Sequence, residues 1–128
     1  MKEPIWIDKP EVLIVHSMQL AEHGGSHGLR DETLLSVLAK PRNIFAYADS
    51  VTLPRLAASY ALGLARNHAF IDGNRRTALV ISEGFLRING LKVVSTPEEK
   101  YFTFLDFAEG SLTEDELTAW FAKHAMPL

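Results

Sequence analysis

Apolar residues recur at helical spacing along most of this chain. The clearest stretch spans positions 53–65, where the apolar residues are Leu53, Leu56, Ala57, Tyr60, Ala61, Leu64 and Ala65. A second pattern from Arg75 to Ile88 predicts another helix, and Gly90 is a suitable place for it to end. Because His68 follows Leu64 by four positions, we expect it to face inward at the end of the first helix.

The N-terminal third predicts two further helices. Residues 10–22 form the first, with Leu13, Ile14, Met18 and Ala21 on its buried side and Gly24-Gly25 ending it. Asp31 is placed to cap a short helix that reaches Leu38. From Pro41 to Thr52 the pattern breaks, so we expect a surface loop anchored by Ile44, Phe45 and Tyr47.

The C-terminal part predicts a short extended connector over 91–95 and then two helices. Thr96 is a suitable cap, Pro97 suits the first helical position, and Glu99 completes a capping-box pattern. Thr113 and Glu116 repeat that pattern before the last helix. The chain therefore predicts an all-α fold, a single domain over 1–128 built as a compact bundle of about six helices, with little β-structure.

Composition narrows the function classes. Hydrophobic residues make up 47% and charged residues 23%, which is ordinary for a globular domain. The net charge of −3 argues against a nucleic-acid surface, and the absence of cysteine excludes disulfides and cysteine-based zinc sites. Charged residues interrupt the apolar ones near the N-terminus, and no apolar run reaches membrane length. We therefore expect a cytoplasmic protein with no membrane partner.

The segment from His68 to Thr77 joins the two central helices and concentrates the chemistry. It leads into a helix N-terminus, where free N–H groups and the helix dipole attract anions. Arg75 and Arg76 add guanidinium groups that suit phosphate oxygens. Asp72 suits Mg²⁺, which takes one or two carboxylates plus substrate phosphates. His68 is a candidate general base for an attacking hydroxyl.

Three further positions shape this loop. Phe70 is apolar within a polar segment and is expected to pin the loop to the core, while Gly73 permits a turn or a close ligand approach. Asn74 is a good helix N-cap. Taken singly, Asp72-Gly73 is an ordinary turn and an arginine pair can be a solvated surface. Their joint occurrence favours phosphoryl or nucleotidyl transfer.

His68 to Arg76 resembles the signature of the Fic/Doc family, H-x-F-x-D/E-G/A-N-G/K-R, and the order of residues on both sides resembles its Doc branch. The resemblance implies an all-α fold and modification of a protein hydroxyl with a nucleotide-derived group. It implies that His68 is the base and Asp72 the metal ligand. It also implies that Asn74 and Arg76 bind phosphate and that Phe70 is the buried anchor.

Within the family, typical Fic members transfer AMP from ATP, whereas Doc transfers the terminal phosphate of ATP to a threonine of translation factor EF-Tu. Four positions of this chain depart from those patterns. Ala69 stands where Fic motifs have proline, and Gly73 is the Fic choice where Doc has alanine. Arg75 replaces a Fic glycine or a Doc lysine, and Leu79 stands where many Fic enzymes have a second arginine.

The last two departures favour Doc-type chemistry. A large cation at Arg75 should obstruct a phosphate chain placed as in AMP-transferring members, and Leu79 removes a partner for that chain. The resemblance thus implies a Doc-type toxin that uses ATP and Mg²⁺. An AMP-transferase and an inactive antitoxin-binding module remain open.

The resemblance also implies a Phd-like antitoxin as a separate inhibitor, since no self-inhibitory S/T-x-x-x-E-G/N motif occurs in the sequence. We expect its disordered tail to fold on an apolar groove near His16, His68 and the 41–52 loop. His16 itself has two interpretations, lining the cleft or bonding within the core, and the second is favoured. A zinc site with His23 and His27 is not expected, because glycines between them break a shared helix face.

Overall fold

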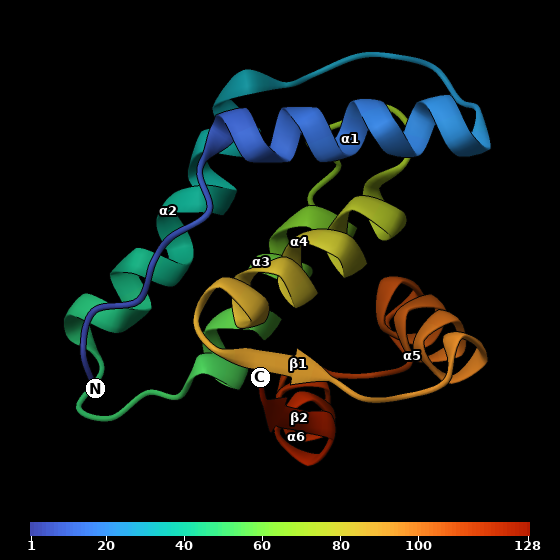
Figure 1. Cartoon of the computed structure of the whole chain (residues 1–128). Coiled ribbons are helices and arrows are strands. Elements are labelled where there is room, and N and C mark those ends of the chain that lie inside the picture. The colour runs from blue at the N-terminus through green and yellow to red at the C-terminus, as the bar shows by residue number, and fades with distance from the viewer.

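Helix α3 (Leu53–Arg66) occupies the centre of the molecule in the computed structural model, which describes residues 1–128 (Figure 1). The other elements, in chain order, are α1 (Lys9–His23), α2 (Asp31–Tyr47), α4 (Asn74–Ile88), β1 (Leu91–Val93), α5 (Pro97–Glu109), α6 (Glu114–His124) and β2 (Ala125–Pro127). The expected all-α architecture of six helices is confirmed. No helix combines the length and the apolar character needed to cross a membrane.

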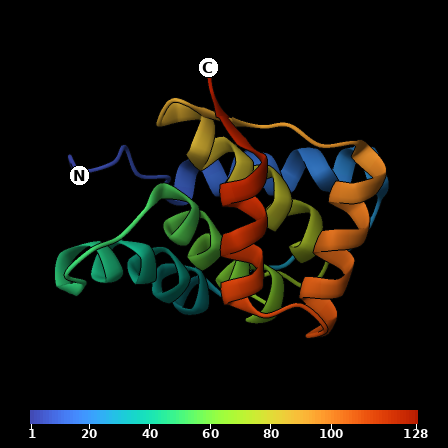
Figure 2. The same ribbon diagram turned by 90° about the horizontal axis from the view of Figure 1, so that it is seen from below.

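The core forms around α3 because small residues on this helix let its neighbours approach closely. Ala57, Ala58 and Ala61 are fully buried. At Gly63, an added Cβ would lie 2.6 Å from Cγ1 of Val37, so α2 packs directly on the backbone of α3. Seen from below, α6 lies between α2 and α5 (Figure 2). The largest buried side chains around these helices are Tyr60, Phe85, Phe104, Phe107 and Phe121.

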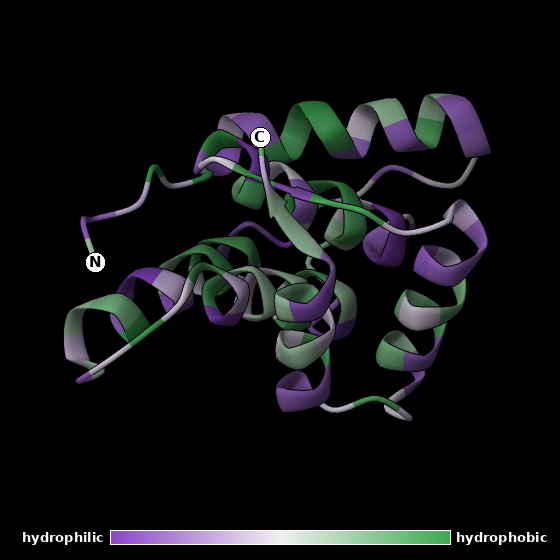
Figure 3. Cartoon of the chain, turned by 60° about the horizontal axis from the view of Figure 1, so that its bottom comes forward, coloured by the Kyte–Doolittle hydropathy of each residue, from purple (hydrophilic) through white to green (hydrophobic).

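The expected buried face of α1 is wrong except at Leu13, which is half-buried and packs against the core. Val12, His16 and Leu20 are the buried residues, at i, i+4 and i+8, whereas Ile14 and Met18 are each 61% exposed and Ala21 is also exposed. Hydrophobic and hydrophilic segments alternate around this helix (Figure 3). The helix thus has two rows of apolar residues at helical spacing. The buried row includes His16, which a hydrophobic pattern counts as polar.

The expected surface loop at 41–52 is also wrong for its first half, because α2 runs on through Pro41 to Tyr47. A proline inside a helix removes one backbone hydrogen bond and normally ends or kinks it. Here the apolar stripe continues through it, since Leu34, Val37, Leu38 and Pro41 are all buried. Burial of the proline ring as part of that stripe offsets the lost hydrogen bond.

The C-terminal elements follow the capping signals. Thr113 and Glu116 form the complete capping box that starts α6, and the hydroxyl of Thr96 accepts from the N–H of Glu99 at the start of α5. The capping box at α5 is incomplete, however, because the Glu99 carboxylate accepts from the hydroxyl of Ser95 instead. That bond is the main reason the pKa of Glu99 is lowered.

The extended connector forms a strand whose partner the sequence did not reveal. Strand β1 pairs antiparallel with β2, and Lys92 lies opposite Met126. The pairing places the C-terminal segment beside the end of α4, where the N–H of Leu128 donates to the carbonyl of Gly90 at 3.0 Å. None of these contacts involves the segment between α3 and α4.

Candidate active site

The motif segment is held by a second loop, which joins α1 to α2. Leu29 and Phe70 form an isolated antiparallel bridge. The N–H of Arg30 donates to the carbonyl of Ala69 at 2.7 Å, and the N–H of Ile71 donates to that of Gly28 at 3.3 Å. An added Cβ at Gly28 would lie 2.3 Å from the end of the Ile71 side chain, so the strand-like contact needs glycine. Sequence analysis missed this pairing, for which the glycines before α2 were the only signal.

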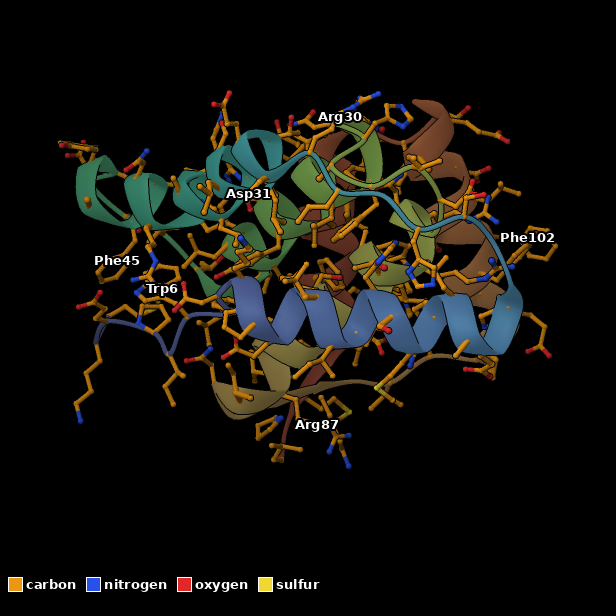
Figure 4. The ribbon with its side chains drawn as sticks, turned by 90° about the horizontal axis from the view of Figure 1, so that it is seen from above. Trp6, Arg30, Asp31, Phe45, Arg87 and Phe102 are labelled. Atoms are coloured by element: carbon orange, nitrogen blue, oxygen red, sulfur yellow. The ribbon has the colours of Figure 1, made fainter.

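His68 is exposed, which corrects the expectation that it faces inward from the end of α3. Helix α3 ends at Arg66, and His68 has a left-handed backbone with φ 54°, the only such non-glycine residue in the chain. A side chain in that conformation costs energy, and such strain is frequent at functional sites. The Arg30 guanidinium donates to the His68 carbonyl at 3.3 Å, and Figure 4 labels Arg30 and the neighbouring Asp31 at the start of α2. The imidazole is thus presented to solvent on a fixed backbone.

Phe70 lies in the core beneath the loop and is 3% exposed. Its ring stacks on the imidazole of His16 with centroids 3.7 Å apart and an interplanar angle of 10°. His16 is itself buried and bonds the carbonyl oxygen of Asp72 through Nε2 at 2.8 Å. The interpretation of His16 as a hydrogen-bonded core residue is confirmed.

Asp72 is exposed on the same loop as His68, two residues beyond the buried Phe70. Its Oδ2 accepts from the N–H of Ser26 at 2.7 Å, while Oδ1 makes no hydrogen bond. No three His, Asp or Glu side chains lie close enough together to hold a metal ion. A single carboxylate fits Mg²⁺ when phosphate oxygens and water supply the other ligands. Asp72 is the residue suited to hold such an ion here.

Asn74 does not cap α4, which corrects one interpretation of this residue. The cap position belongs to Gly73, in the left-handed region at φ 80°, and Asn74 is the first helical residue. Its amide bonds both backbone polar groups of Phe70, with Oδ1 accepting at 3.1 Å and Nδ2 donating at 2.8 Å. One Nδ2 hydrogen remains to meet a ligand.

The N-terminus of α4 has no side-chain cap. The first intrahelical bond there runs from the N–H of Thr77 to the carbonyl of Gly73 at 3.0 Å. The N–H groups of Asn74, Arg75 and Arg76 precede it and have no acceptor within the helix. They are available to an anion, and the helix dipole favours one at this end.

The two arginines differ in their surroundings. Arg76 is exposed beside the free N–H groups. Arg75 is half-buried, and its guanidinium lies over the ring of Tyr101 on α5 at 5.4 Å from the ring centre. That contact is a cation–π interaction, worth about 0.5–1 kcal/mol at an exposed site. Tyr101 therefore restricts where Arg75 reaches, a role that sequence analysis did not predict.

The motif forms an open surface, since none of the four cavities in the molecule is lined by its residues. The largest cavity, about 520 Å³, lies between the end of α2 and the start of α3 and is lined by residues such as Tyr47 and Val51. Figure 1 places this end of α2 far from the α3–α4 segment. The expected groove shared by His16, His68 and residues 41–52 is therefore wrong, also because His16 is buried.

Comparison with known proteins identifies the family of this chain. The model of the Fic/DOC family matches residues 6–86, which include α1 to α4 up to Leu86 and the whole motif. The chain belongs to the Fic/DOC family. The matched residues include both the loop around Arg30 and the motif turn that pairs with it.

Two relatives of this Fic/DOC chain are described by name. It is 32% identical over 93 residues to "Protein kinase doc" of Escherichia phage P1, covering 72% of this chain and 74% of that protein. It is 37% identical over 94 residues to "Toxin Doc" of Mycolicibacterium smegmatis, covering 70% of this chain and 68% of that protein. Both names agree with the resemblance to the Doc branch seen in the motif.

Proposed function

We propose that this Fic/DOC protein is a Doc-type toxin that transfers the terminal phosphate of ATP to a threonine hydroxyl of a protein target. The main support is the arrangement of the motif turn. An exposed His68 and an exposed Asp72 lie on one loop, next to the free N–H groups and arginines of α4. Similarity to a relative named as a protein kinase favours phosphate as the transferred group.

In this proposal each site residue has one role in a single displacement at the γ-phosphorus. His68 accepts the proton of the threonine hydroxyl as its oxygen bonds to the γ-phosphorus and the bond from that phosphorus to the β-phosphate oxygen breaks. The N–H groups of α4, the Asn74 amide and Arg76 stabilise the negative charge. Mg²⁺ bound by Asp72 would neutralise phosphate oxygens. The products are ADP and a phosphothreonine.

EF-Tu is the target that we propose, which would make the activity an inhibition of translation inside the cytoplasm. A protein with this activity needs a restraint, and no self-inhibitory motif occurs in the sequence. A Phd-like antitoxin would supply it. Its site on this chain is not the groove first expected, because residues 41–47 form the distant end of α2.

Transfer of AMP is the second candidate, and Gly73 favours it. This glycine matches the Fic pattern, and its backbone lies at φ 80°, a left-handed conformation that residues with a Cβ rarely adopt. Arg75 argues against it, because a large cation at this position, beside Tyr101, would obstruct a phosphate chain placed as in AMP-transferring members. The two activities differ in which phosphorus of ATP reaches the protein.

Two labelled nucleotides separate the candidates. The purified chain is incubated with bacterial lysate, or with purified EF-Tu, and ATP labelled at either the α- or the γ-phosphorus. We expect the γ-label alone to reach a threonine of EF-Tu, and His68→Ala to abolish it. Transfer of the α-label would assign AMP transfer. A folded protein that transfers neither label would be an inactive binding module.

Growth tests the toxin assignment separately. Expression of the chain alone in a bacterium should arrest growth, and co-expression with the neighbouring gene of its operon should restore it. Arrest should disappear with His68→Ala at the same protein level. Normal growth with an enzyme that is active after purification would contradict the toxin assignment.

A further inference from the structure

We infer that His16 is a positioning residue, which sets the conformation of the Phe70–Gly73 turn and so the direction in which Asp72 presents its carboxylate to a magnesium nucleotide. The inference deepens the proposed function and rests on it for the role of Asp72. His16 lies on α1, outside the motif, and is buried, with 5% of its surface exposed.

His16 contacts three of the four residues of this turn. The imidazole stacks flat on Phe70 with centroids 3.7 Å apart. Nε2 lies 2.8 Å from the carbonyl oxygen of Asp72. Cδ2 lies 3.5 Å from the point where a Cβ of Gly73 would be, so the ring fills the space beneath that glycine. A single side chain thus supports the turn from below.

The hydrogen bond also fixes the chemistry of the ring. A carbonyl oxygen is only an acceptor, so Nε2 must carry a proton and donate it. A buried imidazole is costly unless its polar atoms are bonded, and an apolar ring of similar size would pack on Phe70 without that cost. The stacking explains why the site needs a flat ring. The donor explains why the ring needs to be histidine.

Asp72 is consequently held at two points. His16 holds its backbone carbonyl, and the N–H of Ser26 holds Oδ2. Gly73 follows directly with φ 80°. Because glycine has no Cβ, the Asp72–Gly73 peptide can rotate once the hydrogen bond from His16 to its carbonyl is lost. A change in the backbone angles ψ of Asp72 and φ of Gly73 would shift the Asp72 carboxylate relative to the free N–H groups at the start of α4. Both proposed phosphate and metal contacts therefore depend on His16.

Two variants separate the hydrogen bond from the packing. His16→Phe keeps a flat ring on Phe70 but removes the donor, and His16→Gln keeps an N–H donor near the position of Nε2 but removes the ring. We expect His16→Phe to raise the Mg²⁺ concentration for half-maximal transfer by roughly 10–100-fold, as loss of a residue behind a metal ligand does. The rate at saturating Mg²⁺ should fall less. His16→Gln should stay closer to the wild type.

A role confined to packing predicts the opposite order, with His16→Phe near the wild type and His16→Gln impaired. That order, or an unchanged Mg²⁺ dependence in His16→Phe, would overturn the inference. His16→Met, which also lacks the donor, replaces His16→Phe if the latter does not fold. Urea unfolding of each variant measures the packing contribution separately.

Hydrogen exchange tests the same link without any activity. The N–H of Phe70 is bonded within the turn, to Oδ1 of Asn74 at 3.1 Å. Its exchange in the nucleotide-free protein should be at least several-fold faster in His16→Phe than in His16→Gln. Equal exchange in the two would overturn the inference. A wild-type protein that transfers no phosphate, but shows this difference, would contradict the proposed function and leave the positioning of the turn established.

Discussion

The side-chain amide of Asn74 closes a ring with the backbone of Phe70, accepting from its N–H at 3.1 Å and donating to its carbonyl at 2.8 Å. Asn74 follows Phe70 by four positions, and the turn between them contains Asp72 and Gly73. The amide therefore replaces the backbone bonds that a strand or helix would provide there. It also joins the buried anchor to the first residue of α4.

Asn74→Asp should weaken both the turn and the activity. The carboxylate can still accept from the N–H of Phe70 but has no N–H for its carbonyl, so two acceptors face one another. We expect a stability loss of about 1–3 kcal/mol from the unsatisfied carbonyl. Urea unfolding measures that loss. Asn89→Asp offers a comparison, since the Asn89 amide donates to the carbonyls of Ile5 and Phe85 but lies at the opposite end of α4. Equal transfer rates in both variants would contradict a role in the site for the hydrogen bonds between Asn74 and Phe70.

His68→Ala should lower the rate of transfer by roughly 10²–10⁴-fold, the usual contribution of a general base. His68→Gly should be as inactive, but more stable than the alanine variant by about 1 kcal/mol, because glycine adopts the left-handed conformation at φ 54° without strain. Single-turnover rates and urea unfolding provide the two measurements. If the alanine variant keeps the wild-type rate, His68 is not the base. If the glycine variant gains no stability, the strain is absent.

Asp72→Asn should weaken the Mg²⁺-dependent part of ATP binding, since a neutral amide is a poorer ligand for a hard cation. The amide oxygen can still accept from the N–H of Ser26, so the loop should keep its position. Calorimetry of ATP binding with and without Mg²⁺ is the measurement. Asp49→Asn, at an exposed position outside the motif, is the matched control. An unchanged metal dependence would assign Asp72 to the turn alone.

Arg75→Gly should move the site towards the AMP-transferring pattern by opening space for the phosphate chain. A complete switch is not expected, because Leu79 still stands where a second arginine would bind that chain. A crystal structure with an unreactive ATP analogue should show a displaced phosphate chain and a released Tyr101 ring. Arg87→Gly, at an exposed position in the last turn of α4 (Figure 4), controls for the effect of glycine on the helix. Identical nucleotide placement in the Arg75 variant and the wild type would contradict the prediction.

Tyr60 should make the protein sensitive to alkaline pH. Burial raises the pKa of its phenol from 10.0 to about 12, and the neutral hydroxyl exchanges hydrogen bonds with the backbone of Ile7. Since the folded state holds the phenol proton more tightly than the unfolded state, Tyr60 contributes fully to the free energy of unfolding below pH 10. That contribution is lost as the pH rises towards 12. The loss amounts to roughly 2–3 kcal/mol. Tyr60→Phe should be less stable at neutral pH, and its unfolding free energy should fall less steeply above pH 10. Parallel pH profiles would contradict the assignment.

Features that depend on neighbours along the chain could be predicted from the amino-acid sequence alone. Helices α3 and α4 followed from apolar spacing, and the hydroxyls of Thr96 and Thr113 cap helices as their positions predicted. Helical periodicity and capping involve residues three or four positions apart, so a single sequence displays them. The motif was visible for the same reason, because its residues lie in one continuous segment.

Features that depend on partners distant in the sequence became visible in the folded structure alone. Burial of His16 is offset by a hydrogen bond from its Nε2 to a carbonyl 56 residues away, which no apolar pattern reveals. Helix α3 ends at Arg66 and His68 adopts a left-handed turn whose carbonyl accepts from Arg30, a contact across 38 residues that the local pattern does not display. Pro41 stayed within α2 because its ring joins a stripe packed against the core. In each case, a contact between segments outweighed a local preference worth a few kcal/mol at most.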